Sequence, residues 1–250
     1  MQQLKPVTVP HSPATGEGNL LIDGLPRKER LKLLALCDHV ELVPGAVLCQ
    51  VDEPFDHVYF PVIGCISLVR SLDGRVALDT ELIGCEGMLG VTLVLGVPCA
   101  PQRGRVQSHG RALRMPATQL QSSLEDCPAL VLSLKRYLFV VMVQLSQNAG
   151  CNRFHDVGAR LARGLLMVQD RARSNRFHLT HQSIADMLGV QRGAITLAAG
   201  LLQRKNVISY SRGEITILDR GKLVAASCEC YAARIGTYTQ ILSQPGLLRG

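Results

Sequence analysis

The sequence predicts an α+β protein in which an antiparallel β-roll is followed by a long helix and a C-terminal winged helix-turn-helix domain. Three observations lead to this prediction: short β-rich runs separated by turns, a heptad of apolar residues mid-chain, and two helical patterns followed by a hairpin between Phe177 and Leu218. With 250 residues and 47% hydrophobic content, the chain is long enough for about two domains with separate cores.

The segment from Phe177 to Leu218 has the pattern of a helix-turn-helix. Thr180 is a suitable N-cap for a short amphipathic helix that ends at Gly189, and a second helix should run from about Arg192 to Arg204. The apolar positions expected to be buried are Ile184, Ala185 and Leu188 in the first helix and Ile195, Ala198, Ala199 and Leu202 in the second.

A two-stranded wing follows the second helix. Its strands are predicted around Val207–Tyr210 and Ile215–Ile217, joined by the turn Ser211–Gly213, which puts Arg212 near the tip. Such a unit could be an ordinary α+β corner, but the charge distribution argues otherwise. Residues 151–250 carry 14 Lys and Arg against 6 Asp and Glu, whereas the preceding 150 residues carry 13 against 14. The basic excess therefore lies in the part with the helix-turn-helix, which indicates nucleic acid as a partner.

The chain is expected to have four parts. Residues 1–18 form a flexible tail, residues 19–153 the β-roll with its long helix, residues 154–232 the winged helix-turn-helix domain and residues 233–250 a C-terminal tail, with a polar hinge at Gly150–Asp156. The elements expected in the second part are a helix at Pro26–Cys37 and strands at Glu41–Val43, Val47–Cys49, His57–Phe60, Cys65–Arg70, Arg75–Leu82, Gly104–Val106 and Ala112–Met115, with turns that include Gly64 and Asp73-Gly74.

A heptad seam marks the long helix, which is expected from Pro128 to about Asn148 (128–148). Leu134, Leu138, Val141 and Leu145 follow a 4-3-4 spacing. A helix of about 20 residues spans about 30 Å, so a seam this apolar needs a partner, either the roll of the same chain or the same helix of a second chain. Because a helix-turn-helix usually binds DNA as a twofold pair, we expect these four residues to form a homodimer interface.

Location and redox state follow from composition. No apolar run approaches the roughly 20 residues of a membrane span, and the first residues lack the apolar stretch of a signal peptide, so a cytoplasmic protein without membrane contact is expected. Nine dispersed cysteines are an odd number, which favours reduced thiols. Cys228 and Cys230 form a close pair, but no second Cys or His pair lies at zinc-finger spacing, so no metal site is expected.

Several short motifs add to this plan. They are Pro44-Gly45, Val58-Tyr59-Phe60-Pro61, Asp73-Gly74-Arg75, Gly87-Met88-Leu89-Gly90, Phe154-His155-Asp156-Val157 and LTHQSIADMLGVQR from Leu179. In this order and spacing they resemble the Crp/Fnr family of bacterial transcription regulators over roughly residues 20–225. The resemblance implies a regulator that binds double-stranded DNA as a homodimer, contacts RNA polymerase and responds to an unidentified signal, such as a small-molecule effector, at a cyclic-nucleotide-binding-like β-roll.

The resemblance also maps an effector pocket and argues against cyclic AMP in it. The pocket residues are Glu86, Gly87, Met88, Gly90, Gln102, Arg103, Leu145 and Ser146. In cyclic-AMP-binding members a glutamate holds the ribose hydroxyl and an Arg-Ser pair holds the phosphate. Here Met88 and Gln102-Arg103 stand in those positions, and Leu145-Ser146 replaces two adjacent hydroxyl residues.

Other cofactors have little support. An iron–sulfur cluster is disfavoured because the first cysteine, Cys37, has no close neighbour. Haem stays open, with His57 and His109 as candidate ligands, although an isolated histidine usually lies at the surface or is capped.

The resemblance also defines the DNA contacts. The expected residues are Thr180, Gln182, Gln191, Arg192, Gly193, Thr196, Arg204 and Arg212. Arg192 matches the first arginine of the family's recognition helix, whereas Gly193 and Leu197 occupy its Glu and second Arg positions, so the operator should differ from that of the cyclic-AMP receptor.

Two other classes of function differ from a signal-controlled regulator: an enzyme and a constitutive DNA binder. No nucleophile with its base, phosphate-cradling glycine motif or carboxylate pair supports an enzyme. The alternative is a ligand-independent, constitutive DNA binder in which the β-roll is only a dimerisation scaffold.

Overall fold

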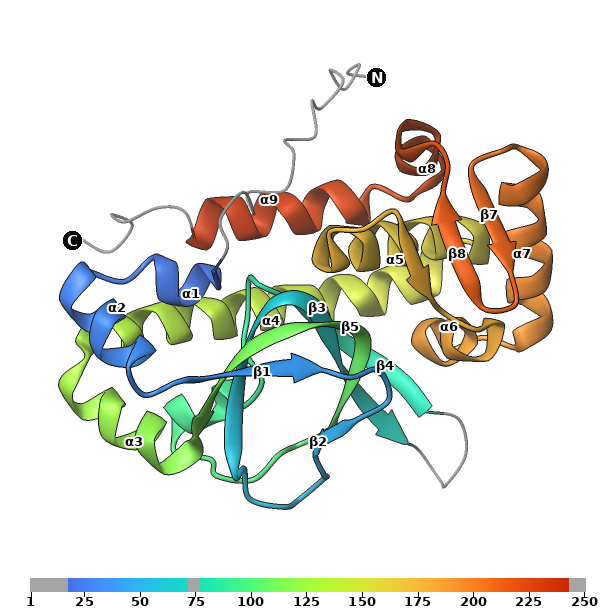
Figure 1. The fold of residues 1–250 in the computed structure, drawn as a ribbon. Coiled ribbons are helices and arrows are strands. Elements are labelled where there is room, and N and C mark those ends of the chain that lie inside the picture. Colours follow the sequence, from blue (N-terminus) through green and yellow to red (C-terminus); the bar gives the residue numbers. More distant parts are fainter. Residues whose placement is uncertain (1–17, 72–76, 243–250) are drawn as a thin grey trace.

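The computed structural model describes residues 18–71 and 77–242 of the chain (Figure 1). The predicted fold class is confirmed: a β-roll with the long helix α4 forms one part, and a winged helix-turn-helix forms the other. The expected N-terminal tail up to residue 17, the Asp73-Gly74 turn and residues 243–250 of the expected C-terminal tail lie outside the described residues.

The elements of the two parts follow in chain order. The first part contains α1 (Leu20–Asp23), α2 (Arg27–Leu34), β1 (Asp38–Leu42), β2 (Val47–Cys49), β3 (His57–Ser71), β4 (Ala77–Ile83), the 3-10 helix η1 (Val91–Leu95), β5 (Arg103–Pro116), α3 (Ala117–Asp126) and α4 (Pro128–Phe154). The second part contains α5 (Val157–Ala172), β6 (Arg176–His178), α6 (His181–Leu188), α7 (Arg192–Arg204), β7 (Ile208–Ser211), β8 (Glu214–Ile217), α8 (Arg220–Ala226) and α9 (Cys230–Leu242).

The roll is an antiparallel sheet in the order β1-β5-β3-β4, with β2 paired to β5. Two pairs of predicted strands merge here into the long strands β3 and β5. Gly64, expected at a turn, instead lies inside β3 at φ +86°, in a stretch where the register against β5 shifts. A Cβ on Gly110, in β5, would stand 1.9 Å from the carbonyl oxygen of Ile63. The two glycines therefore let the strands bend and pass closely, so the chain bulges without turning back.

Helix α4 covers the roll of its own chain, which corrects the expected dimer seam. Leu134 and Tyr137 are fully buried in the core of the roll, and Val141 packs against the same core. Leu138 is half-buried, and Leu145 is 44% exposed. Heptad spacing identifies an apolar face but not its partner, and here the roll covers much of that face.

A second apolar strip on α4 faces outward. Leu132, Phe139, Met142 and Leu145 are between 37% and 68% exposed. Contrary to the expectation from composition, α4 is also long and apolar enough to cross a membrane, the one such helix in the described part of the chain. Its other face is covered by protein, however, and includes the fully buried polar residue Gln144. Helix α4 therefore packs on its own domain with one face and leaves an apolar strip exposed on the other.

The expected C-terminal tail is wrong for residues 233–242, which belong to helix α9. This helix packs against α4 and α5 and lies beside the long helix (Figure 1). Its buried face includes Arg234, only 3% exposed, which donates to a carboxylate oxygen of Glu81 in β4 and to the side-chain oxygen of Gln144 in α4. An arginine in the middle of the buried face breaks the apolar periodicity, which explains why the sequence did not indicate this helix.

A break between α4 and α5 separates the two parts. The expected polar hinge, 150–156, is helical through Phe154, and the chain leaves the helical conformation at His155 and Asp156. Asp156 then caps α5, since its Oδ1 accepts from the backbone nitrogen of Ala159 at 3.0 Å. The chain therefore changes direction over two residues.

Arg234 should be a major determinant of stability. Burial raises the pKa of Glu81, and the Arg234 guanidinium opposes that shift. Replacing Arg234 by Met leaves the Glu81 carboxyl buried without its cation, which we expect to lower the free energy of unfolding by about 3 to 5 kcal/mol in urea titrations. The double variant Glu81→Gln/Arg234→Met should recover part of that loss.

Lys32→Met is the matched control, because Lys32 forms an exposed ion pair with Asp126. Its removal should leave the urea midpoint unchanged. Equal midpoints for Arg234→Met and Lys32→Met would show that the buried pair does not hold α9 in place.

Candidate DNA-binding surface and the β-roll cavity

Helix α6 is fixed at both ends by local interactions. Thr180 is its N-cap, as predicted, and its Oγ1 accepts from the backbone nitrogen of Ser183 at 3.0 Å. Gly189 ends the helix at φ +61°, a conformation that glycine adopts without steric cost. Ile184 and Leu188 are buried against the rest of the domain. The turn after α6 is therefore set by a cap and a glycine.

Helix α7 has one buried and one open face. Its predicted bounds, Arg192–Arg204, are confirmed, and the buried residues are Ile195, Ala198, Ala199 and Leu202. Arg192, Gly193 and Thr196 are exposed, and Leu197 is 73% exposed. Nothing stands within 4 Å of a Cβ built on Gly193. This face can therefore approach another surface closely, with a cation at its start and an apolar side chain one turn further on.

His181 is a residue of this surface that the sequence did not single out. Its ring stacks on Tyr210 with centroids 4.3 Å apart, and its Nδ1 lies 3.1 Å from the hydroxyl oxygen of Thr196. Burial, followed by the charge of Arg192, lowers the pKa of His181. The imidazole therefore links α6, α7 and the wing in its neutral form. In the sequence, the only indication of its role was its position directly after the N-cap Thr180.

The tip of the wing lies beside the start of α6. The backbone nitrogen of Leu179 donates to the carbonyl oxygen of Gly213 at 2.7 Å, and Arg212 is exposed next to it with φ +51°. Glu214, the acid of the wing, accepts from Arg176 at 3.1 Å and lies 3.0 Å from His178. Both neighbours, in the unpredicted strand β6, lower the pKa of Glu214, and the Arg176 guanidinium offsets its charge. The wing therefore presents a basic tip.

All eight residues predicted to contact DNA are exposed, but they do not form one compact cluster. Gln182 donates to Asp186 Oδ1 at 2.8 Å, and Gln191 lies at the N-cap of α7 without a side-chain cap bond. Arg192 begins α7 and Arg204 ends it, so about 18 Å of helix separates their backbones. Neither of these arginines, nor Arg212, forms an ion pair with another described residue. Their charges are available to phosphates along an extended surface.

The cavity inside the roll is small and largely apolar. Its volume is about 50 Å³, and its lining includes Phe55, Leu68, Met88, Gln102 and Tyr137. Met88, at the family's ribose-binding position, is fully buried in the core. Sites for small molecules usually measure about 300 to 1,000 Å³. In this structure the predicted pocket is therefore filled by the chain's own side chains.

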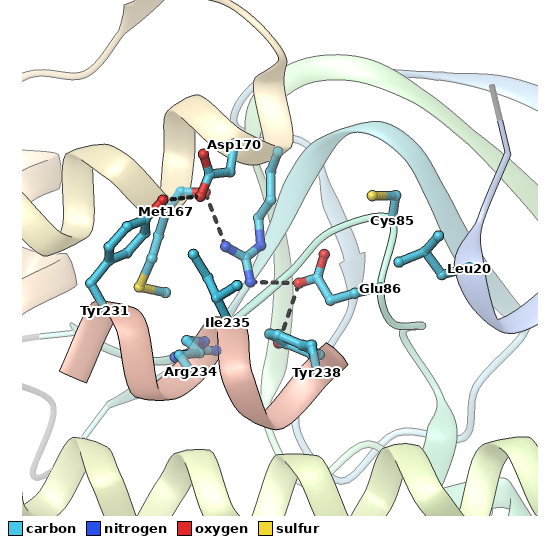
Figure 2. Close-up of a pocket in the computed structure, with 10 residues that line it drawn as sticks. Leu20, Cys85, Glu86, Met167, Asp170, Tyr231, Arg234, Ile235 and Tyr238 are labelled. Atoms are coloured by element: carbon cyan, nitrogen blue, oxygen red, sulfur yellow. Dashed lines mark hydrogen bonds and ion pairs between the residues drawn. The ribbon is translucent and has the colours of Figure 1, made fainter. Parts of the chain in front are cut away.

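Five of the predicted pocket residues, Gly87 and four others, do not line this cavity. Arg103 begins β5 as a half-buried residue, and Leu145 and Ser146 are exposed on α4. Glu86 turns away from the roll, as Figure 2 shows, where its carboxylate pairs with Arg171 of α5 and accepts from the Tyr238 hydroxyl at 3.3 Å. The motif placed Glu86 correctly along the chain but could not indicate the side of the loop that it faces.

The remaining two positions lie in the same tight loop. Gly90 lines the cavity at φ +95°. A Cβ on Gly87 would stand 2.2 Å from the hydroxyl oxygen of Tyr137. The loop is therefore packed directly on α4, which leaves no room for a larger residue at Gly87.

An exposed second helix and a basic wing define a DNA-binding helix-turn-helix domain. Residues 159–226 match the Crp-like helix-turn-helix domain family. The chain is 27% identical to the global nitrogen regulator of Synechocystis over 180 residues, which cover 66% of this chain and 77% of that protein.

Solved structures share the whole architecture. A CRP/FNR-family transcriptional regulator from Thermus thermophilus has a TM-score of 0.62 at 20% identity and covers 76% of this chain and 98% of its own. The c-di-GMP-responsive global regulator CLP of Xanthomonas campestris has a TM-score of 0.61 at 15% identity and covers 77% of this chain and 99% of its own. Residues 159–226 are thus a Crp-like helix-turn-helix domain, and the chain shares its fold, a β-roll with a C-terminal helix-turn-helix, with these regulators.

Proposed function

We propose that the protein is a sequence-specific transcriptional regulator whose helix α7 enters the major groove of double-stranded DNA. The open face of α7 carries this proposal, because Arg192 is free to reach a guanine or a phosphate and Leu197 can contact a thymine methyl group. Arg212 at the wing tip is placed to contact the backbone. The relatives of this protein are regulators and not enzymes, and we propose the same for this chain. We also propose that it acts in the cytoplasm and that RNA polymerase is a further partner.

We also propose that the regulator is a homodimer held by the outward strip of α4. Leu132, Phe139, Met142 and Leu145 form an exposed apolar surface along one helix, which a second copy of the helix would cover. A twofold pair would present two copies of α7 to two half-sites. Of the interface residues expected from the heptad, Leu145 belongs to this strip, whereas Leu134 and Val141 already pack on the roll.

Control by a signal at the roll is the finer part of the proposal, and a constitutive DNA binder is the second candidate. The small, filled cavity favours the constitutive DNA binder over a regulator that binds a nucleotide in the roll. Comparing the DNA affinity of the purified protein with and without an extract of cell metabolites separates the two. An affinity that changes with the extract supports a signal, and an unchanged affinity supports constitutive binding.

Removing Arg192 and removing Arg212 should have different effects on DNA binding. Arg192→Ala should cost about 1 to 3 kcal/mol on the preferred site and relax the preference at one position in each half-site, because a base contact is lost. Arg212→Ala should weaken all sequences about equally and reduce the salt slope by about one unit, because a phosphate contact is lost. Binding selections over randomised duplexes and salt titrations measure both effects.

If the preferred sequence of Arg192→Ala equals that of the wild type, Arg192 does not read a base. Lys28→Ala, on the distant helix α2, is the control that should change neither quantity.

Charge on the outward strip should dissociate the dimer. Met142, 68% exposed, would lie in the interface, so Met142→Glu places an unpaired carboxylate there in both subunits. We expect a monomer in sedimentation experiments at micromolar concentration. Leu95→Glu, at a 61% exposed apolar residue of the roll, is the matched control and should stay dimeric. A dimeric Met142→Glu variant would rule out the strip.

Cyclic AMP should not bind in the roll at micromolar concentration. The cavity is too small, and Met88 supplies no carboxylate for the ribose. Isothermal titration calorimetry should show no saturable heat. A micromolar dissociation constant that Arg103→Ala abolishes would show that the roll opens and that Arg103 holds the phosphate.

A further inference from the structure

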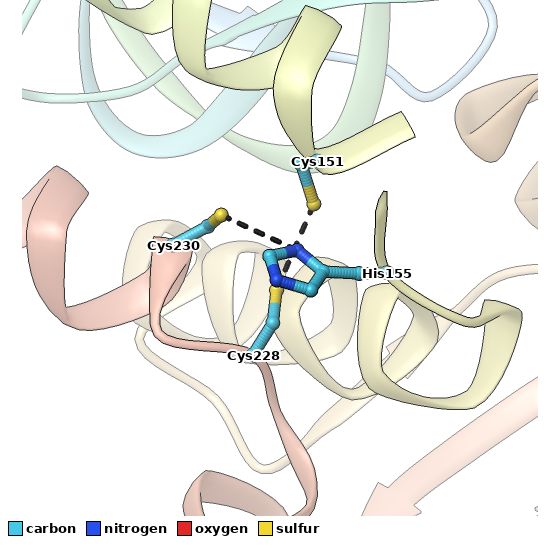
Figure 3. A group of neighbouring side chains, drawn as sticks. All are labelled: Cys151, His155, Cys228 and Cys230. Carbon is cyan, nitrogen blue, oxygen red and sulfur yellow. Dashed lines mark hydrogen bonds between the residues drawn. The ribbon is translucent and has the colours of Figure 1, made fainter. Parts of the chain in front are cut away.

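Four side chains that commonly bind metals meet at the end of α4 (Figure 3). Cys151 lies in the last turn of α4, and His155 is the residue at its C-cap. Cys228 lies in the link between α8 and α9, 77 positions after Cys151, and Cys230 is the first residue of α9. Their ligand atoms all lie within 4.8 Å of one another. The sequence shows no second Cys or His pair at zinc-finger spacing from Cys228 and Cys230. In the fold, Cys151 and His155 at the end of α4 supply this second pair.

The separations within this cluster match one tetrahedral ion. The Sγ atoms of Cys151 and Cys228 are 3.7 Å apart, and the Sγ of Cys230 lies 3.6 Å from the Nδ1 of His155. Bonds of about 2.3 Å to sulfur and about 2.0 Å to nitrogen in a tetrahedron put two sulfurs about 3.8 Å apart and a sulfur and a nitrogen about 3.5 Å apart. These two distances fit a tetrahedron around one ion, and no two of the four ligand atoms are more than 4.8 Å apart.

Other uses of these thiols fit less well. A disulfide requires sulfur atoms about 2.0 Å apart, and all nine cysteines are free thiols. An iron–sulfur cluster holds several iron and sulfide ions between its ligands and so needs a wider space than that around a single ion. Three thiolates with one imidazole are instead a ligand set typical of structural zinc.

The surroundings support a bound cation through His155. Its Nε2 lies 3.0 Å from the carboxylate of Glu229, whereas its Nδ1 lies 3.6 Å from the Sγ of Cys230. A carboxylate on the outer nitrogen of a metal-bound histidine fixes the ring and its tautomer. Glu229 stands between Cys228 and Cys230, so the segment that supplies two ligands also orients a third.

The charge of the site is also balanced. Arg163 of α5 interacts electrostatically with Cys151. Arg160, in the first turn of α5, interacts electrostatically with Cys151 and Cys228. Zinc with three thiolates carries one net negative charge, which these two cations can offset.

We propose that Cys151, His155, Cys228 and Cys230 form a structural zinc site that fastens the end of α4 to the start of α9. Zinc displaces one proton from each thiol to solvent, and no electron is transferred. All four positions of the tetrahedron are filled by protein, as in structural and not catalytic zinc sites. Because the ligands lie on both sides of the break at His155, the ion restricts the direction in which the helix-turn-helix leaves α4.

Metal content tests this site directly. Protein purified under reducing conditions without chelators should carry one zinc ion per chain in native mass spectrometry. Cys151→Ser and Cys228→Ser should each lose it, whereas Cys99→Ser, at a half-buried thiol outside the cluster, should keep it. Zinc in the wild type that both cluster variants retain would overturn the proposal, as would iron and sulfide in place of zinc.

Cobalt titration of the metal-free protein separates loss of a ligand from loss of the fold. Co²⁺ should give the intense visible absorption of tetrahedral thiolate coordination at one equivalent, and His155→Cys should retain it with four sulfur ligands. Glu229→Gln should weaken zinc binding by about 10- to 100-fold without changing the cobalt spectrum. Weak, octahedral-type absorption in the wild type would contradict the proposal. No readout involves DNA, so these results are independent of the proposed regulatory function.

Discussion

The position of the DNA-binding part depends on charges that two helices carry into the protein interior. Arg234 of α9 is buried against Glu81 and Gln144, and Arg171 of α5 is buried against Glu86. Water cannot reach these groups freely, so separating either arginine from its carboxylate would leave an uncompensated buried charge, which is far more costly than losing an exposed ion pair. The helix-turn-helix is therefore tied to the roll by contacts that are satisfied in one arrangement.

The same contacts connect the roll to the DNA surface. Glu81 lines the roll cavity and also pairs with Arg234, while Glu86 belongs to the tight loop whose next residues, Gly87 and Met88, pack on α4 and fill the cavity. A change of shape at the cavity thus bears directly on the charges that hold α9. A regulatory signal would have to alter these two acidic residues. In a constitutive binder, both of their ion pairs would stay intact.

The sequence predicted elements whose signals are local. Thr180 and Gly189 delimit α6 because a cap and a left-handed glycine act within one turn, and the bounds of α7 followed from helical spacing. The sequence did not predict features that depend on contacts between residues distant in the chain. Leu134 is covered by the roll and not by a second copy. Helix α9 was missed because its buried face contains Arg234. The cysteine cluster is the extreme case, since spacing along the chain cannot show that α4 ends beside Cys228.

The proposed function requires that two copies of α7 read DNA as a twofold pair. The most direct measurement is selection of random double-stranded DNA by the wild-type protein, followed by sequencing of the bound fraction. We expect an enriched, twofold-symmetric sequence whose half-sites are about one helical turn, or about 10 base pairs, apart from centre to centre. Binding without enrichment of any sequence, or enrichment of a single unrepeated half-site, would contradict it.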